Sequence, residues 1–157
     1  MNNTMETAEG KLGRVIAVRL CPGSDVLLGL EEACKKYDIN NGVIISAIGS
    51  LQTPLFCDVV ELPTKAGYGY GETLHLTGPI ELVSATGIVC HDDEDVTNLH
   101  VHMTVTDRHG NAHGGHLVEG TKVLLTTDVV IAEIDGLVMG RKLDPYYEVP
   151  LFAPRQK

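Results

Sequence analysis

Histidines are concentrated in one short stretch of this chain. Five of the seven histidines lie between Leu99 and Val118, in the sequence LHVHMTVTDRHGNAHGGHLV. Histidine is the side chain that most often binds metal ions. His100 and His102 are two residues apart in an alternating apolar run, so on a β-strand both imidazoles would leave the same face. The spacing therefore predicts a pair of ligands on one strand.

A third histidine joins this pair only in one register of a β-hairpin. The polar, glycine-containing stretch from Asp107 to Gly115 predicts a turn centred near His109 and Gly110. The residues that this turn would pair are Thr106 with Ala112, Thr104 with Gly114, and His102 with His116. Directly opposed residues have Cβ atoms about 4.5 to 5.5 Å apart, which would bring His116 to the pair. A slip of one residue would send His116 to the opposite face.

Three neutral imidazoles in one place indicate a transition-metal site. Nitrogen ligands suit Zn²⁺, and also Fe, Ni or Co, better than Mg²⁺ or Ca²⁺. A fourth position left for water or substrate is typical of catalytic zinc sites. The alternative is that the histidines only make polar contacts at a half-exposed sheet face. For His109 and His113, which we expect in the turn itself, we favour a solvated loop.

One helix and about seven strands must position these histidines. Apolar residues recur at three- and four-residue spacing from Val26 to Tyr37, after a helix N-cap at Ser24 or Asp25. The expected strands are Lys11–Leu20, Val43–Ile48, Phe56–Leu62, Thr73–Thr77, Ile80–Cys90, the two strands of the histidine hairpin, and Lys122–Ile134. The continuous apolar run at Val43–Ile48 predicts burial on both faces. This pattern predicts an α+β fold, a mainly antiparallel sheet with the helix packed on it.

The length of 157 residues predicts a single domain with short terminal extensions. We expect a flexible tail over residues 1–10 and the folded domain over residues 11–138. The segment 139–157, which contains three prolines, is expected to run as an extended tail along the surface or along a neighbouring subunit. The glycine-dense stretch Gly67-x-Gly69-x-Gly71 lacks the helix and lysine of a phosphate-binding loop, and predicts a mobile hairpin loop.

Charge and composition argue against nucleic acid and membrane as partners. The formal net charge is −9, whereas DNA-binding domains carry a basic face that neutralises phosphates. The acidic run from His91 to Asp95 is expected to be a solvated loop that would repel phosphate. The sequence has no apolar run long enough for a membrane span and no basic leader, which predicts a cytoplasmic protein. The four scattered cysteines fit buried, reduced thiols.

The chain resembles the plants-and-prokaryotes conserved (PPC) domain family from about residue 11 to residue 138. The combination of the GGHL motif with the strand that follows it is the specific part of this resemblance. The residues that carry it are Gly13-Arg14-Val15, the helix after Pro22-Gly23, Gly49-Ser50-Leu51, His100-x-His102, Asp107, Gly110, Gly114-Gly115-His116-Leu117, Gly120 and Thr127-x-Val129-Val130. The resemblance implies an α+β domain that assembles as a homotrimer.

The resemblance implies two different functions. Plant members of the family are fused to AT-hooks, and prokaryotic members are therefore commonly described as DNA-binding, but this chain has no Arg-Gly-Arg-Pro hook. The family fold is also similar to acetolactate decarboxylase and to zinc-dependent ester hydrolases, which hold zinc with a His-x-His pair and a later histidine. His100, His102 and His116 match that pattern.

The decarboxylase adds carboxylates and an arginine around its metal, but no residue of this chain can be assigned to those roles from sequence. The residues of the right type are Glu61, Glu72, Arg14 and Glu133. For each of them we favour a surface or interface ion pair.

Three hypotheses follow from the sequence. The first is a metal-binding protein in which the three histidines hold Zn²⁺ or a similar divalent ion, with hydrolase or lyase chemistry on a small molecule if it is an enzyme. The second is a DNA-associated regulator. The third is a trimeric scaffold with a structural metal.

Overall fold

The computed structural model describes residues 5–92, 94 and 96–157, and in these residues it contains one helix and two sheets. The helix is α1 (Val26–Tyr37). The strands are β1 (Lys11–Leu20), β2 (Gly42–Thr53), β3 (Leu55–Cys57), β4 (Val59–Glu61), β5 (Tyr68–Tyr70), β6 (Leu74–His75), β7 (Ile80–His91), β8 (Thr97–Thr106), β9 (Ala112–Leu117), β10 (Lys122–Asp135), β11 (Leu137–Leu143) and β12 (Pro150–Gln156). No described helix is long and apolar enough to cross a bilayer.

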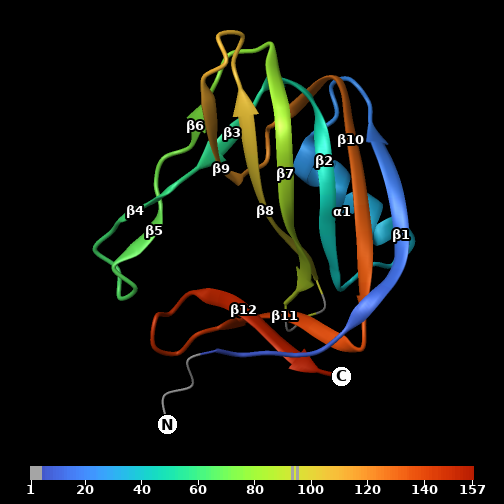
Figure 1. Ribbon diagram of the computed structural model, residues 1–157. Helices are drawn as coiled ribbons and strands as arrows, with labels where there is room; N and C mark the ends of the chain where they lie inside the picture. Colours follow the sequence, from blue (N-terminus) through green and yellow to red (C-terminus); the bar gives the residue numbers. More distant parts are fainter. Residues whose placement is uncertain (1–4, 93, 95) are drawn as a thin grey trace.

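The main sheet is almost entirely antiparallel. Its strands follow the order β1-β10-β2-β7-β8-β9-β3-β6, and β11 and β12 extend it from the end of β7. Figure 1 shows β2, β7 and β8 side by side at its centre, with β11 and β12 across their lower ends. The α+β class is therefore confirmed, but the prediction of about seven strands was too low. Short strands such as β6 (two residues) give too little alternation to be recognised in a sequence.

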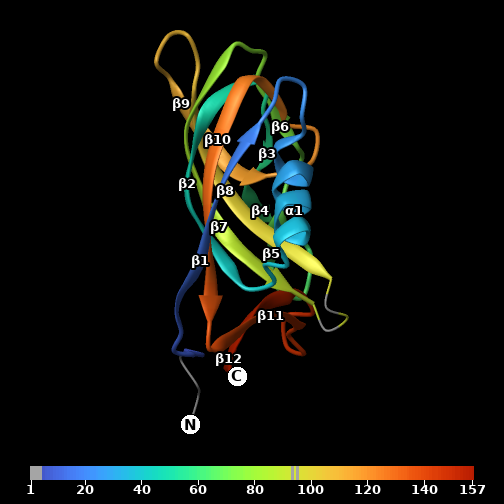
Figure 2. The same ribbon diagram turned by 90° about the vertical axis from the view of Figure 1, so that its right-hand side faces the viewer.

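The helix covers only one face of the sheet (Figure 2). It begins after Asp25, whose carboxylate accepts a hydrogen bond from the backbone N–H of Leu28 at 3.1 Å. Leu30 and Cys34 project from the helix into the core, where they join sheet residues such as Val101 and Ile131. The hydrophobic core therefore lies between α1 and the sheet.

The opposite face of the sheet carries no helix. Ile45 and Ile48 of β2 are exposed there, so the prediction that Val43–Ile48 is buried on both faces is wrong for the single chain. The apolar pattern was correct, but the one helix cannot cover two faces. Cys21 is also exposed, against expectation, whereas the other three cysteines are buried.

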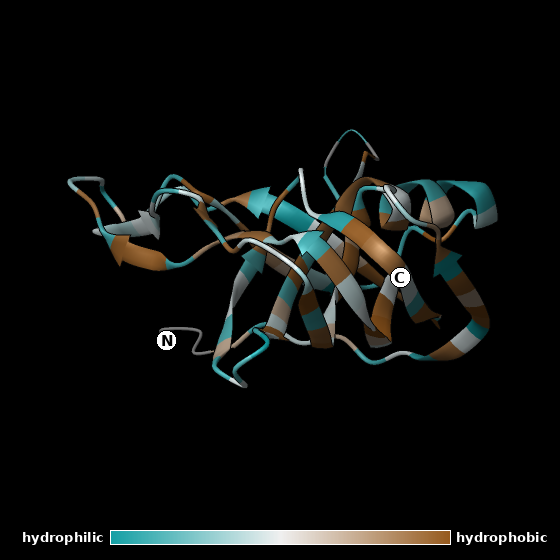
Figure 3. Ribbon diagram, turned by 90° about the horizontal axis from the view of Figure 1, so that it is seen from above, coloured by the Kyte–Doolittle hydropathy of each residue, from teal (hydrophilic) through white to brown (hydrophobic). Residues whose placement is uncertain are grey.

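A two-stranded arm, formed by β4 and β5, projects from the body of the molecule (Figure 3). Gly67 forms its turn with a φ of +77°, which favours glycine. The glycine-dense stretch is therefore a hairpin, as predicted. At the tip, Lys65 Nζ lies 2.9 Å from a carboxylate oxygen of Glu148, so the arm is tied to the loop between β11 and β12.

The segment before β1 lies beside the C-terminal strand β12. An extended tail was expected from residue 139, but residues 137–143 and 150–156 form the paired strands β11 and β12. The backbone N–H of Glu9 donates to Gln156 Oε1 at 3.2 Å, and Gln156 Nε2 donates back to the carbonyl of Glu9. In the acidic run, Asp93 and Asp95 lie outside the described residues.

Candidate metal centre

The β8–β9 hairpin adopts the predicted register. His102 pairs with His116, Thr104 with Gly114 and Thr106 with Ala112. Alternate residues of β8, including Val101 and Val105, are fully buried against the core. A slip of one residue would expose these valines. The burial of these valines on the core face of β8 therefore keeps His100 and His102 on the opposite face.

Glycines allow the strands around the histidines to approach closely. A Cβ at Gly114 would collide with the carbonyl oxygen of Met103, and a Cβ at Gly87 with the carbonyl oxygen of His100. At Gly115, a Cβ would lie 2.9 Å from the carbonyl oxygen of Cys57 on β3. The Gly114-Gly115 pair therefore lets β9 pass between β8 and β3 directly before His116.

The three imidazoles meet at one point. His100, His102 and His116 each offer a ring nitrogen, and these atoms all lie within 4.8 Å of one another. The Nε2 atoms of His100 and His102 are 3.1 Å apart. Ligands of a tetrahedral ion bound at about 2.05 Å lie about 3.3 Å from each other, so the nitrogen atoms are already near ligand spacing.

The structure adds Tyr70, which the sequence analysis did not identify. Its hydroxyl lies 3.2 Å from His100 Nε2 and 3.1 Å from His116 Nδ1. Its ring also stacks on the His116 ring, with centroids 4.4 Å apart. Tyr70 reaches the histidines because it lies on β5, at the base of the arm. No spacing in the sequence signals this contact, which joins residues 30 and 46 positions apart.

The imidazoles of His100 and His116 are held in their neutral, coordinating form. Burial lowers the pKa of His116 to about 4, and the neighbouring basic groups His100, His102 and Arg141 lower it further because they disfavour a second positive charge. Burial, His102 and Arg141 also lower the pKa of His100. Metal ligation requires the neutral imidazole, so protons do not compete for these two ligands at neutral pH.

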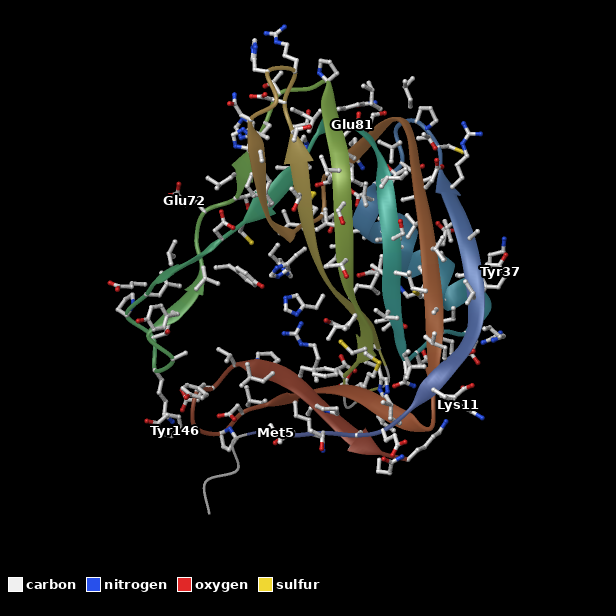
Figure 4. All side chains as sticks on the ribbon, in the orientation of Figure 1. Met5, Lys11, Tyr37, Glu72, Glu81 and Tyr146 are labelled. Carbon is white, nitrogen blue, oxygen red and sulfur yellow. The ribbon has the colours of Figure 1, made fainter. Side chains whose placement is uncertain are left out.

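Arg141 is the second residue that the sequence analysis missed. It lies on β11, half-buried, and Nη1 donates to Asn98 Oδ1 at 3.2 Å while Nη2 donates to the carbonyl of Pro150 at 2.9 Å. Figure 4 shows nitrogen-bearing side chains gathered beside β8, between β8 and β11. The segment from residue 139 was expected to be an extended tail rather than a strand, so no sequence pattern placed Arg141 near the histidines.

The acidic and basic residues considered from the sequence lie elsewhere. Arg14 Nε forms a salt bridge with Glu133 at 2.7 Å between β1 and β10, as a surface ion pair was expected to do. Glu61 is exposed on the arm, and Glu72 points away from the molecule (Figure 4). Among the described residues, no carboxylate belongs to the histidine cluster.

The other two histidines of the hairpin stay apart from the cluster. His109 lies in the turn, as predicted. His113 is part of β9 rather than of the turn, which corrects the prediction of a loop. It pairs with Val105 and therefore faces away from the cluster.

Asp107 holds the turn of the hairpin, and we predict that Asp107→Ala destabilises the protein at pH 7. Its carboxylate accepts hydrogen bonds from the backbone N–H groups of His109 and Asn111 and from Asn111 Nδ2, at 2.8, 3.0 and 2.9 Å. The side chain and backbone of Asn111 and the backbone of His109 lower the pKa of Asp107 from 3.8 to about 2.

A carboxylate with a lowered pKa stabilises the fold above its unfolded pKa, and this stabilisation is lost as the pH falls through the folded value. Thermal melting should therefore show a lower melting temperature for Asp107→Ala between pH 7 and pH 5. This difference should shrink as the pH is lowered from about 4 towards 2. A difference that is unchanged at the lowest pH at which both proteins fold would contradict the assignment.

A pocket of about 320 Å³ adjoins the histidine pair. It is lined by Val43, Thr86, Gly87, Ile88, His100 and His102. This volume is at the lower end of the range for ligand sites, about 300 to 1,000 Å³. The pocket therefore suits a small molecule whose apolar part would contact Val43 and Ile88.

Solved structures share this fold along nearly the whole chain. A PPC protein from Pyrococcus horikoshii is 29% identical with a TM-score of 0.81, and the match covers 98% of this chain and 100% of that one. A protein from Archaeoglobus fulgidus described as metal-containing is 25% identical with a TM-score of 0.79, covering 94% and 99% of the two chains. A Ralstonia eutropha protein named as a candidate DNA-binding protein shares the fold at 20% identity, with a TM-score of 0.72, covering 87% and 89%.

The family is shown by a match to a sequence profile. A curated relative, the bifunctional protein GlmU of a Synechococcus strain, is 28% identical over 132 residues, which are 84% of this chain and 19% of that protein. The chain thus spans about a fifth of the length of the curated relatives it matches. The profile of the Plants and Prokaryotes Conserved (PCC) domain matches residues 7–135. The chain therefore belongs to the PCC domain family.

Proposed function

We propose that this chain binds one divalent transition-metal ion, of the zinc type, through His100, His102 and His116. The observation that carries the proposal is the convergence of three imidazole nitrogens within 4.8 Å of one another. Three neutral nitrogen donors match the preferences of zinc and its neighbours. The metal-containing relative from Archaeoglobus fulgidus, which has the same fold, supports this assignment.

We propose further that this site acts on a small molecule. Three protein ligands leave a coordination position for an exchangeable ligand. A zinc-type ion, when bound, supplies a Lewis acid that polarises a carbonyl or lowers the pKa of a water to about 7. Tyr70 adds a hydroxyl at the same point, and the adjoining pocket holds 320 Å³. This arrangement favours hydrolase or lyase chemistry.

Titration of metal-free protein with Co²⁺ tests the site and its open position together. The d–d absorption of Co²⁺ should saturate at one equivalent per chain and disappear when Zn²⁺ is added. Imidazole should then change the spectrum of the cobalt protein by occupying the open position. A cobalt spectrum that imidazole leaves unchanged would favour the structural-metal scaffold, and no cobalt spectrum would overturn the proposal.

Charge makes DNA a poor candidate partner for this chain. The net charge of −9 would oppose the phosphate contacts that supply most DNA affinity. We expect no gel shift at micromolar protein in 50 mM salt. A shift that weakens steeply with added salt would favour the DNA-associated regulator instead.

The exposed face of the sheet supports self-association, and we propose the homotrimer that the family resemblance implies. Four adjacent strands, β1, β10, β2 and β7, contribute exposed apolar side chains. They are Val15, Leu125, Ile45, Ile48 and Val83. Exposed apolar side chains on neighbouring strands are typical of a protein interface. The free cysteines suit a reducing compartment, which supports a cytoplasmic location.

We predict that Leu125→Glu dissociates this assembly. Leu125 is 67% exposed, so the substitution spares the core but places a charge in the proposed interface. Light scattering should give three times 16.9 kDa for the wild type and a smaller mass for the variant. Leu143→Glu, at a similarly exposed leucine on β11, should leave the mass unchanged. If only Leu143→Glu dissociates the assembly, the interface lies on the hairpin of β11 and β12 instead of on the exposed sheet face.

A further inference from the structure

Arg141 lies on the histidine side of the sheet, near the start of β8. β11 runs parallel to β7 and pairs with it through Gly140 and His91. The next residue, Arg141, donates to Asn98 Oδ1 at 3.2 Å. Asn98 and His100 are two residues apart on β8, so both project from the same face. The guanidinium is therefore held beside the three-histidine cluster.

The guanidinium is oriented by the protein but keeps free donors. Two of its five N–H groups are used, by the side-chain oxygen of Asn98 and the carbonyl of Pro150. Three N–H groups remain for another acceptor. In the described part of the chain, no carboxylate forms a salt bridge with Arg141. A fixed, half-buried arginine without a counter-ion in the described structure offers a site to an anion.

The charge beside the cluster is positive, although the chain as a whole is acidic. Arg141 is a permanent cation held next to Asn98. Among the described residues, no carboxylate belongs to the histidine cluster. A bound divalent ion would add two further positive charges. An anionic ligand would balance this excess, whereas a neutral one would not.

We propose that Arg141 binds the carboxylate of a small ligand whose other end occupies the open position on the metal. This inference rests on the metal site proposed above. Arginine pairs with a carboxylate through two parallel N–H···O bonds. The Tyr70 hydroxyl lies 3.2 Å from His100 Nε2 and can donate a hydrogen bond to the same ligand.

A carboxylate fits this environment better than a phosphate does. Phosphate sites usually combine several cations or the backbone N–H groups of a helix N-terminus or glycine-rich loop. Here Arg141 supplies one guanidinium, and α1, the one helix of the described residues, packs on the other face of the sheet. The adjoining pocket, lined in part by Val43 and Ile88, would hold the rest of a small molecule.

Acetate and imidazole provide matched probes for this role. Both can occupy the open position of cobalt-loaded protein, but only acetate carries a negative charge. Arg141→Met should weaken acetate binding at least about tenfold, as judged from the cobalt spectrum, and change imidazole binding less than about twofold. Arg141→Lys, which keeps the charge but not the planar donor pair, should give an intermediate loss. Lys142→Met removes the adjacent, exposed cation and should change neither affinity.

Three other results would each overturn a different claim: the role of Arg141, the choice of a carboxylate, or the metal site itself. If cobalt and imidazole bind but acetate affinity is equal in wild type and Arg141→Met, the role of Arg141 is overturned and the metal site stands. If inorganic phosphate binds more tightly than acetate and depends on Arg141, the carboxylate assignment is overturned. If cobalt does not bind to the wild-type protein, both this inference and the proposed function are overturned.

Discussion

Replacing His102 with alanine should weaken zinc binding at least about 100-fold. The variant would keep two of the three nitrogen ligands, and even groups that only orient a ligand change metal affinity about 10- to 100-fold. His102 is exposed, so its removal leaves the hydrophobic core intact. The metal-free variant should therefore melt within a few degrees of the metal-free wild type.

Isothermal titration with Zn²⁺ measures this loss, and His113→Ala provides the matched control. His113 lies on the same hairpin but pairs with Val105, facing away from the cluster. Its removal should leave the zinc affinity within about twofold of the wild type. Equal losses in the two variants would mean that zinc binds non-specifically to the hairpin.

The second large effect is expected from Gly114→Val, which should reduce both stability and metal affinity. A Cβ at this position collides with the carbonyl oxygen of Met103, so β9 must move away from β8. Forcing extra atoms into a tightly packed position costs about 1 to 3 kcal/mol. His116 lies two residues further along β9 and would move with the strand.

Ala112→Val is the control for this substitution. Ala112 is exposed and shares a face of β9 with Gly114, so a valine there adds the same type of side chain without a collision. Urea unfolding and zinc titration should show wild-type behaviour for Ala112→Val and losses in both measurements for Gly114→Val. A Gly114→Val protein with full zinc affinity would show that the close approach of β9 to β8 is not needed to form the site.

Short-range patterns were sufficient to predict the elements that carry the candidate site. The helix has the predicted bounds, Val26–Tyr37, because its apolar spacing and its N-cap at Asp25 are local signals. The strand Lys11–Leu20 also has the predicted bounds. The pairing of His102 with His116 followed from one turn and the alternation of β8, both of which can be read within twenty residues.

Contacts between distant segments could not be predicted from one sequence. Tyr70 meets the histidines only because the β4–β5 arm places it there. Arg141 reaches Asn98, two residues before His100, because β11 joins the end of β7 through a single pairing at Gly140 and His91. Neither element has a periodic pattern long enough to indicate its partner. The sequence therefore predicted the three histidines, whereas the structure was needed to find the groups around them.

The metal content of protein produced without a histidine tag tests the central claim most directly. Inductively coupled plasma mass spectrometry should find about one equivalent of a zinc-type divalent metal per chain, and almost none in His102→Ala prepared in the same way. Less than about half an equivalent in the wild type, unchanged in His102→Ala, would contradict the assignment of His100, His102 and His116 as a metal site.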